Sequence, residues 1–180
     1  MLALVIIDMQ RWMFRTPERS DQVGNILPAI DGLASHFAQA NLPIYDVVTI
    51  HQPDRSTWSR LMIKYNYSCL IEGTPDAEPV DGYKAPPSAK RIVKTQNSVF
   101  LHTDFETTLN ADGVTKLLLT GVFMDGCVGL TAADAAQRRF EVVCISDGIG
   151  HVDVKMRRSM EEWLHQMYEI DQIQAACIPL

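Results

Sequence analysis

Apolar and polar positions follow two different periods along the 180-residue chain. The segment 2–7 is apolar throughout and rich in branched residues, which is typical of a strand buried on both faces of a parallel sheet. Similar runs predict further strands at 43–50, 91–94, 116–120, 142–146 and, near the end of the chain, 173–178.

Between these runs, apolar residues recur three or four positions apart, which is the spacing of an amphipathic helix. This spacing predicts helices over 21–40, 126–139 and 153–168. Pro28 falls inside the first helix, and we expect it to bend that helix or to mark its true first turn. The last helix has an apolar face made of Met156, Met160, Trp163, Leu164 and Met167.

Strands that alternate with helices predict right-handed crossovers and a mostly parallel sheet covered on both faces. We therefore expect an α/β fold with three α/β/α layers. The length fits one domain, so residues 1–180 are assigned to a single domain.

The stretch 52–90 interrupts this alternation. It contains five prolines and an aromatic cluster of Trp58, Tyr65 and Tyr67. A loop of this length inside a compact domain usually has a function. A lid, a contact between subunits and simple packing over the sheet are all open interpretations.

Composition and charge disfavour several classes of partner. The net charge is −6 and no run of Lys or Arg forms a basic stripe, so we expect no nucleic-acid partner. The apolar start ends at Asp8, too early for a signal peptide or a membrane span, so we expect no membrane partner. The four cysteines include no CxxC pair, which favours a reduced protein in the cytoplasm.

Asp8, Lys94 and Cys127 follow or end three of the predicted strands. Sites in open α/β sheets form outside the carboxyl ends of the strands, so we expect these side chains on one rim of the sheet. Each residue alone has a plainer explanation: Asp8 as a cap, Lys94 as a solvated lysine, and Cys127 as a small buried residue. The three together are harder to dismiss.

Cys127 is expected near the amino end of a helix, where the helix dipole and free N–H groups favour a thiolate. We therefore expect a thiol pKa below the free value of about 8.5. Taken alone, a reactive nucleophile and a packing residue have equal weight. Asp8 is the candidate that moves the thiol proton, and Lys94 the candidate that stabilises the thiolate.

On these residues the chain resembles the isochorismatase-like cysteine hydrolases. The resemblance rests on three blocks in the family's order: 3–10 with Phe14, Lys94 with 97–100, and 121–128 with its continuation 131–135. It implies a Rossmann-like sheet of about six parallel strands, with Asp8 as base, Lys94 as cationic partner and Cys127 as nucleophile.

The resemblance also implies details of the site. A cis peptide bond is expected at Phe123–Met124, and the N–H groups of Met124 and Cys127 are expected to form an oxyanion hole. Phe14, His51 and Trp58 are candidates for the wall of a substrate pocket. His51 has no carboxylate two residues before it, which makes a poor metal site, so we expect no catalytic metal and no cofactor.

The function implied by the resemblance is hydrolysis of a C–N bond in a small amide, carbamoyl or ureido compound through a Cys127 thioester. True isochorismatases typically lack this cysteine, so its presence favours amide hydrolysis. Family members usually assemble, so we expect a homo-oligomer.

The alternative is a catalytically weak or silent oligomeric scaffold or binding protein, because many relatives have Thr and Asn where this chain has Met124 and Asp125. A nucleotide binder is disfavoured because no GxGxxG follows the first strand. Phosphotransfer on Asp8 is disfavoured because position 10 is Gln10.

Overall fold

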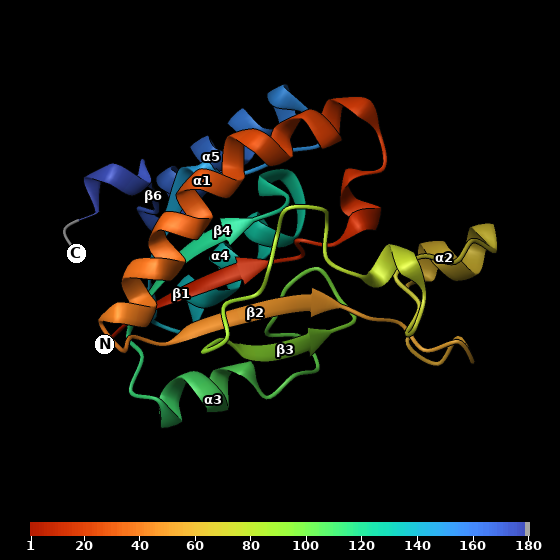
Figure 1. Cartoon of the computed structure of the whole chain (residues 1–180), viewed down its shortest axis with the longest axis horizontal. Coiled ribbons are helices and arrows are strands. Elements are labelled where there is room, and N and C mark those ends of the chain that lie inside the picture. The colour runs from red at the N-terminus through yellow and green to blue at the C-terminus, as the bar shows by residue number, and fades with distance from the viewer. Residues whose placement is uncertain (179–180) are drawn as a thin grey trace.

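One six-stranded sheet forms the centre of the computed structural model, which describes residues 1–178 (Figure 1). All neighbouring strands are parallel, in the order β3-β2-β1-β4-β5-β6. The strands are β1 Leu2–Ile7, β2 Ile44–Thr49, β3 Lys90–Lys94, β4 Lys116–Gly121, β5 Glu141–Ile149 and β6 Asp171–Ile173. The predicted α/β fold and its parallel sheet are confirmed.

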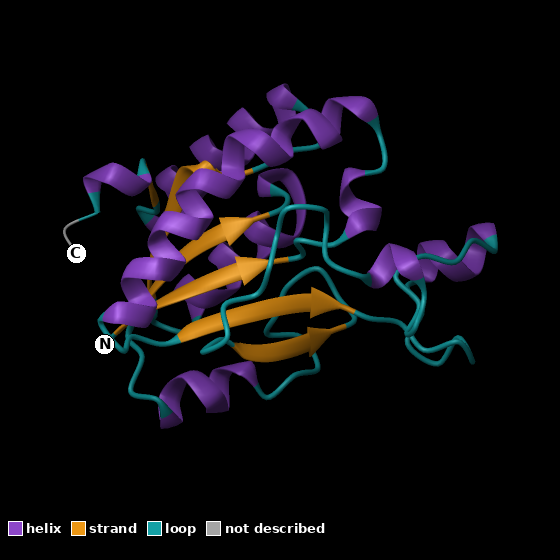
Figure 2. Ribbon diagram, viewed as in Figure 1, coloured by secondary structure: helices purple, strands orange, loops and turns teal. Residues whose placement is uncertain are grey.

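Helices lie on both sides of the sheet, which gives the three predicted layers (Figure 2). The α-helices are α1 Pro17–Gln39, α2 Arg60–Tyr65, α3 Phe105–Ala111, α4 Gly129–Gln137 and α5 Val154–Tyr168. Shorter helical turns are η1 Arg11–Phe14, η2 Pro75–Ala77, η3 Met124–Val128 and η4 Ala175–Cys177. Figure 1 shows α2 apart from the layers, beyond the arrowheads of the strands.

Two apolar cores explain why β1 is apolar at almost every position. Ala3, Val5 and Ile7 point to the core beneath α3, α4 and α5, while Leu4 and Ile6 point to the core beneath α1. All five side chains are 0% exposed. Apolar burial at about 25 cal/mol per Å² is the main force that holds such layers together.

The first helix continues through Pro28 and starts earlier than predicted, at Pro17. Proline lacks an N–H and leaves the carbonyl four residues earlier, here that of Gly24, without its partner. Both Pro28 and Gly24 are exposed, so water can satisfy that carbonyl and the helix need not end. The prediction that Pro28 marks the first turn is wrong.

The last predicted strand is shorter than expected. β6 ends at Ile173, and residues 175–177 form the turn η4. The N–H of Ala175 donates to the Asp147 carboxylate at 2.9 Å instead of a neighbouring strand, which ends the ladder. The prediction of a strand over 173–178 is wrong beyond Ile173.

Two helices, α2 and α3, were absent from the sequence-based expectation. The apolar face predicted for α5 is only partly covered: Leu164 is 0% exposed, whereas Met156 and Met167 are 58% and 59% exposed. Short helices carry little periodic signal, and the spacing of a longer helix does not show what covers it.

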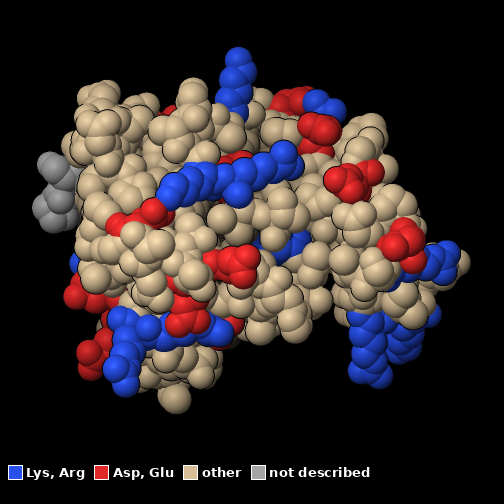
Figure 3. Space-filling view, turned by 90° about the horizontal axis from the view of Figure 1, so that it is seen from below, with Lys and Arg blue, Asp and Glu red and all other residues tan. Residues whose placement is uncertain are grey.

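The surface has no dominant sign of charge on the side seen in Figure 3, where acidic and basic side chains are interspersed with broad uncharged areas. Among the described residues, no helix combines the length and hydrophobicity needed to cross a membrane.

Candidate active site

Three strand ends bring Asp8, Lys94 and Cys127 together. Asp8 follows β1, Lys94 is the last residue of β3, and Cys127 lies in the turn after β4. These strands are near neighbours, because β2 alone separates β1 from β3 and β4 lies on the other side of β1. Asp8 has a left-handed φ of 54°, and its N–H donates to Val47 O at 2.8 Å.

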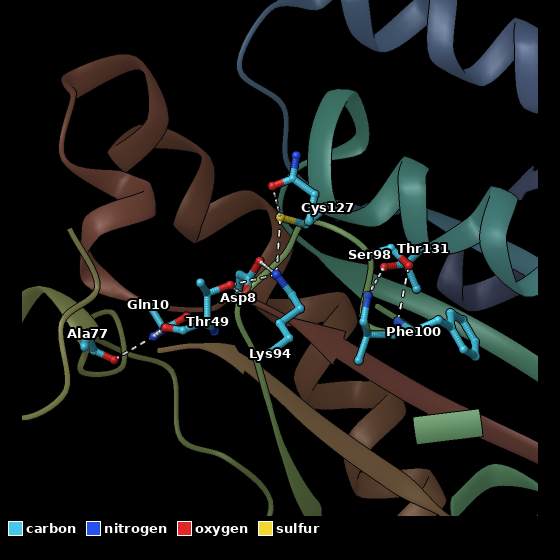
Figure 4. A network of polar contacts seen from close by, with 11 residues as sticks. Asp8, Gln10, Thr49, Ala77, Lys94, Ser98, Phe100, Cys127 and Thr131 are labelled. Carbon is cyan, nitrogen blue, oxygen red and sulfur yellow. Dashed lines mark hydrogen bonds and ion pairs between the residues drawn. The ribbon is translucent and has the colours of Figure 1, made fainter. Parts of the chain in front are cut away.

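The Lys94 ammonium is the centre of the cluster, as Figure 4 shows. Its Nζ donates to Asp8 Oδ2 at 2.8 Å and to the Thr49 hydroxyl at 2.7 Å, and lies 3.4 Å from Cys127 Sγ. The Thr49 hydroxyl in turn donates to Asp8 Oδ1 at 2.9 Å. Both oxygens of Asp8 are therefore engaged, and the ammonium faces the sulfur.

Burial determines the charges in this cluster, because the side chains of Asp8 and Lys94 are both 0% exposed. Burial alone lowers the pKa of Lys94, but the Asp8 carboxylate and Cys127 raise it above its usual value. Burial and the Asp8 carboxylate raise the pKa of the Cys127 thiol to about 12, and Lys94 only partly opposes them. The resting site holds an ion pair beside a neutral thiol.

The expectation of a lowered thiol pKa is therefore wrong for the resting site. It considered the start of the helix but not the burial of the thiol. Cys127 follows the kink at Asp125 and Gly126 and leads through Val128 into α4, so the thiol does stand near the start of a helix, but its burial is the larger effect on the pKa. The Asp8 carboxylate also lies close enough to disfavour a second negative charge.

Thr49 and Gln10 support the triad and were not predicted. Thr49 is the register partner of Lys94 on the neighbouring strand, which explains why its hydroxyl reaches the ammonium. The Gln10 amide pairs with the Thr49 backbone at 2.9 Å in both directions and donates to Ala77 O at 2.8 Å. In the sequence, two polar residues that follow or end a strand are a weak signal. Only the order of the strands shows that Thr49 and Gln10 lie beside the triad.

The loop after β3 is fastened to α4 by side chains. The Ser98 hydroxyl donates to Asp134 at 2.6 Å, and the Val99 N–H donates to the Thr131 hydroxyl at 3.2 Å. This loop carries Asn97, whose Oδ1 lies 3.8 Å from Cys127 Sγ. The contacts fix the residues that follow Lys94 beside the nucleophile candidate.

The turn before Cys127 differs from the prediction. The cis peptide bond joins Val122 to Phe123 rather than Phe123 to Met124. The Val122 N–H still donates to Ile7 O at 2.9 Å, so the chain leaves the sheet directly after Val122, and the cis bond lies one residue earlier than expected. The Met124 N–H donates to Gly150 O at 2.9 Å and is thus not free for an oxyanion hole.

Asp125 has a structural partner. Its carboxylate accepts the N–H groups of Val152 and Asp153 at 2.9 and 2.8 Å, and so holds the segment before α5. The Asp125 charge is therefore directed at backbone donors rather than at the Cys127 sulfur.

A cavity of about 280 Å³ opens onto Cys127. His51 lines it, and its Nδ1 lies 2.8 Å from Thr57 O. Burial lowers the pKa of His51, which favours the neutral imidazole. Phe14 and Trp58 do not line this cavity: Phe14 packs in the core against Phe123, and the Trp58 indole donates to Gln52 O. Neither of the two aromatic pocket candidates therefore lines the cavity that opens onto Cys127.

The donor set beside Cys127 does not fit a metal. His51 is the imidazole that lines the cavity, and its ring already has a backbone partner. Within residues 1–178, no three His, Cys, Asp or Glu side chains lie close enough together to hold an ion. The expectation of no catalytic metal stays a prediction.

Comparison with known proteins identifies relatives of this chain. A ureidoacrylate amidohydrolase of Methylorubrum extorquens is 28% identical over 97 residues, or 54% of this chain and 39% of its own length. A probable inactive nicotinamidase of Arabidopsis thaliana is 32% identical over 142 residues, which cover 74% of this chain and 71% of the relative.

The solved structure of an isochorismatase family protein from Desulfovibrio vulgaris has a TM-score of 0.85 and 27% identity, covering 97% of this chain and 94% of that one. The family model of the isochorismatase domain matches residues 2–170. The chain therefore belongs to the isochorismatase family.

Proposed function

We propose that this chain is a cysteine hydrolase that cleaves a C–N bond of a small amide, carbamoyl or ureido compound through a thioester on Cys127. The observation that carries the proposal is the Lys94 ammonium, 2.8 Å from Asp8 and 3.4 Å from the Cys127 sulfur. The name of one relative, a ureidoacrylate amidohydrolase, supports an amide or ureido substrate.

In the first step the Cys127 sulfur attacks the carbonyl carbon and its proton passes to Asp8. The raised pKa of the thiol, about 12, means that this proton leaves during the attack rather than before it. Lys94 stays positive and offsets the negative charge that moves from carboxylate to sulfur and then to the carbonyl oxygen. The triad therefore acts as a proton shuttle beside a fixed cation.

In the second step the C–N bond breaks as Asp8 gives its proton to the nitrogen, which leaves as ammonia or an amine. The acyl group stays on Cys127 as a thioester. Water then attacks the thioester carbon, Asp8 accepts a proton from that water, and the C–S bond breaks. The proton returns to the sulfur, and the acid product leaves.

The oxyanion needs N–H donors near Cys127, and Met124 is no longer one of them. We keep the Cys127 N–H in this role and assign the second donor to Phe123, because the Phe123 N–H makes no hydrogen bond to any residue between 1 and 178. Preorganised donors of this kind contribute about 2.7–4 kcal/mol each to the transition state.

The alternative function is a silent oligomeric scaffold or binding protein, and the relative named as inactive favours it. Two observations argue against a silent protein. Lys94 contacts both Asp8 and Cys127, and the Asp125 carboxylate binds backbone N–H groups rather than approaching the sulfur. A scaffold would not need two unexposed charges next to a thiol, since such pairs are costly to bury.

The test is to capture the acyl group. The chain is mixed with a panel of small amides and ureido compounds, quenched in acid and weighed as intact protein, while released ammonia is measured in parallel. We expect a mass increase on Cys127 and ammonia release that both disappear in Cys127→Ala. Cys177→Ala, which removes an exposed thiol, is the control and should keep both. Full turnover in Cys127→Ala would overturn the proposal.

We further propose a homo-oligomer in the cytoplasm that acts on a small molecule without a cofactor. The mass of the native protein by light scattering tests the assembly: a mass of two or more chains of 20.2 kDa supports it, and the mass of a single chain overturns it. Full activity after exhaustive dialysis against a chelator would support the absence of a metal, and loss of activity that zinc restores would contradict it.

A further inference from the structure

Two arginines line the cavity above Cys127. Arg15 follows η1 and Arg19 lies in the first turn of α1, and both belong to the wall that also contains Phe123 and Asn97. None of the described residues in that wall is an aspartate or a glutamate. The cavity therefore has two positive side chains and no lining carboxylate.

Both guanidinium groups are held by aromatic rings. The Arg15 guanidinium carbon lies 3.7 Å from the centre of the Trp12 ring, and that of Arg19 lies 5.2 Å from the centre of the Phe123 ring. Stacking uses the flat face of a guanidinium and leaves the N–H groups on its edge available. The aromatic rings therefore position the two guanidinium groups without occupying their N–H donors.

Few of these donors have partners. One nitrogen of Arg15 donates to Trp12 O at 3.0 Å, and the Arg19 side chain makes no hydrogen bond or ion pair with any residue between 1 and 178. Arg19 is partly buried, whereas Arg15 is exposed. Arginine is normally paired or fully hydrated, so an unpaired, partly buried guanidinium such as that of Arg19 in a cavity wall is suited to a ligand with a complementary anion.

The charges around Arg19 come from three side chains. Burial and the positive charge of Arg15 lower the pKa of Arg19, while Asp125 and Glu18 raise it. The Asp125 carboxylate is already bound by two backbone N–H groups, and neither acid lies in the cavity wall. A carboxylate placed between the two guanidinium groups would relieve their mutual repulsion.

We infer that Arg15 and Arg19 form an anion subsite, and that the substrate is a small amide carrying a carboxylate a short spacer away from its scissile C–N bond. This inference rests on the proposed function, because it assigns the substrate class of the same site. The Arg19 guanidinium lies over the Phe123 ring, and Arg19 and Cys127 line the same cavity of about 280 Å³, so a carboxylate bound by Arg19 leaves the rest of a small ligand in the space that opens onto the sulfur.

The test compares ligands of equal size that differ in charge. Malonamate, succinamate and glutaramate each have a neutral counterpart in which the carboxylate is a second amide. Binding is measured by calorimetry on Cys127→Ala, which prevents turnover, and hydrolysis is measured on the chain with Cys127 intact. Each protein is studied as it stands and with Arg15→Gln, with Arg19→Gln, with both changes together or, as the control, with Arg11→Gln.

Arg11 is a matched control because it lies in η1, pairs with Asp81 at 3.1 Å and is not in the cavity wall. We expect at least one anionic ligand to bind tenfold or more tightly than its neutral counterpart. Arg19→Gln and Arg15→Gln should remove that preference and raise KM for the anion at least tenfold. The neutral ligand and Arg11→Gln should change less than twofold.

The two proposals can fail separately. Tight binding of an anion without hydrolysis or acylation would keep the subsite and overturn the cysteine hydrolase. Equally efficient hydrolysis of the charged and the neutral compound of each pair would support the cysteine hydrolase and overturn the anion subsite. Absence of an anion preference in every pair, or a preference that survives Arg15→Gln and Arg19→Gln together, also overturns the subsite.

Discussion

The Asp8 carboxylate and the Lys94 ammonium form a 2.8 Å ion pair in which both side chains are 0% exposed. Apolar residues of similar volume often pack as stably as such a pair, so burial of two charges is poor support for a role in stability alone. The third neighbour of the ammonium is the Cys127 sulfur at 3.4 Å. This arrangement supports the proposed movement of a proton at that sulfur.

Lys94→Met should destabilise the fold strongly, because it leaves the Asp8 carboxylate buried without its cation. We expect the free energy of unfolding to fall by about 3–5 kcal/mol, the usual cost of breaking a buried pair. Adding Asp8→Asn should recover more than half of that loss, because the remaining partner is then neutral. Urea denaturation of the single and double variants measures both effects, and losses that simply add would contradict the interpretation.

Asp8→Asn should separate the reactivity of the thiol from catalysis. Since the Asp8 carboxylate helps to raise the pKa of Cys127, its removal should lower that pKa. Alkylation at pH 8 should become faster by about tenfold for each unit by which the pKa falls. Hydrolysis should instead fall by about 10²–10⁴, because no group is left to move the proton.

Iodoacetamide labelling followed by peptide mass analysis gives the rate at Cys127 and, in the same sample, at the exposed Cys177 as the internal control. Slower labelling of Cys127 in Asp8→Asn, with Cys177 unchanged, would show that Asp8 favours the thiolate and would contradict the assigned charges.

Much of the site could be predicted because strand ends are visible in sequence. Asp8 and Lys94 each follow an apolar run, and the carboxyl ends of parallel strands share one edge. Thr49 could not be assigned in the same way, since its role depends on β2 lying between β1 and β3, and strand order is not written in local spacing.

Two errors have the same physical origin. The pKa of Cys127 depends on burial and on a carboxylate 119 positions away in the chain, neither of which the segment around Cys127 reveals. Arg15 and Arg19 were overlooked because a basic side chain near the start of a helix is ordinarily solvated. Only the fold shows that both line the cavity and that Arg19 lies over the Phe123 ring. Long-range contacts limited the prediction more than secondary structure did.

Tyr83→Phe should weaken the fold in a pH-dependent way. The Tyr83 hydroxyl donates to the buried Asp46 carboxylate at 2.6 Å. Burial raises the pKa of Asp46, although Tyr83 and Arg91 oppose this effect. Because the folded-state pKa lies above the unfolded one, stability linked to Asp46 is present at low pH and lost as pH rises through the folded pKa.

We expect Tyr83→Phe to lower the free energy of unfolding by about 1–3 kcal/mol at pH 7, where the carboxylate loses its donor, and by less at pH 4. Asp46→Asn keeps an acceptor for Tyr83 without the charge, and should flatten the pH dependence. Thermal melts between pH 4 and pH 7 check this, and an equal loss for Tyr83→Phe at both pH values would argue against a charged Asp46.

Gly121→Ala should disrupt the turn that presents Cys127. Gly121 ends β4 with a φ of 98°, and a Cβ there would clash with the backbone carbonyl of Ile7, on the strand that leads to Asp8. A backbone atom cannot yield as a flexible side chain does, so we expect the free energy of unfolding to fall by more than about 4 kcal/mol, or the chain not to fold.

Gly32→Ala is the matched control: Gly32 lies in α1 with nothing within 4 Å of the added Cβ, and the substitution should stabilise the fold by about 0.5–1 kcal/mol. Denaturant midpoints of the two variants decide the matter, and a tolerated Gly121→Ala would mean that the approach of β4 to β1 is looser than the 2.9 Å hydrogen bond from Val122 N–H to Ile7 O indicates.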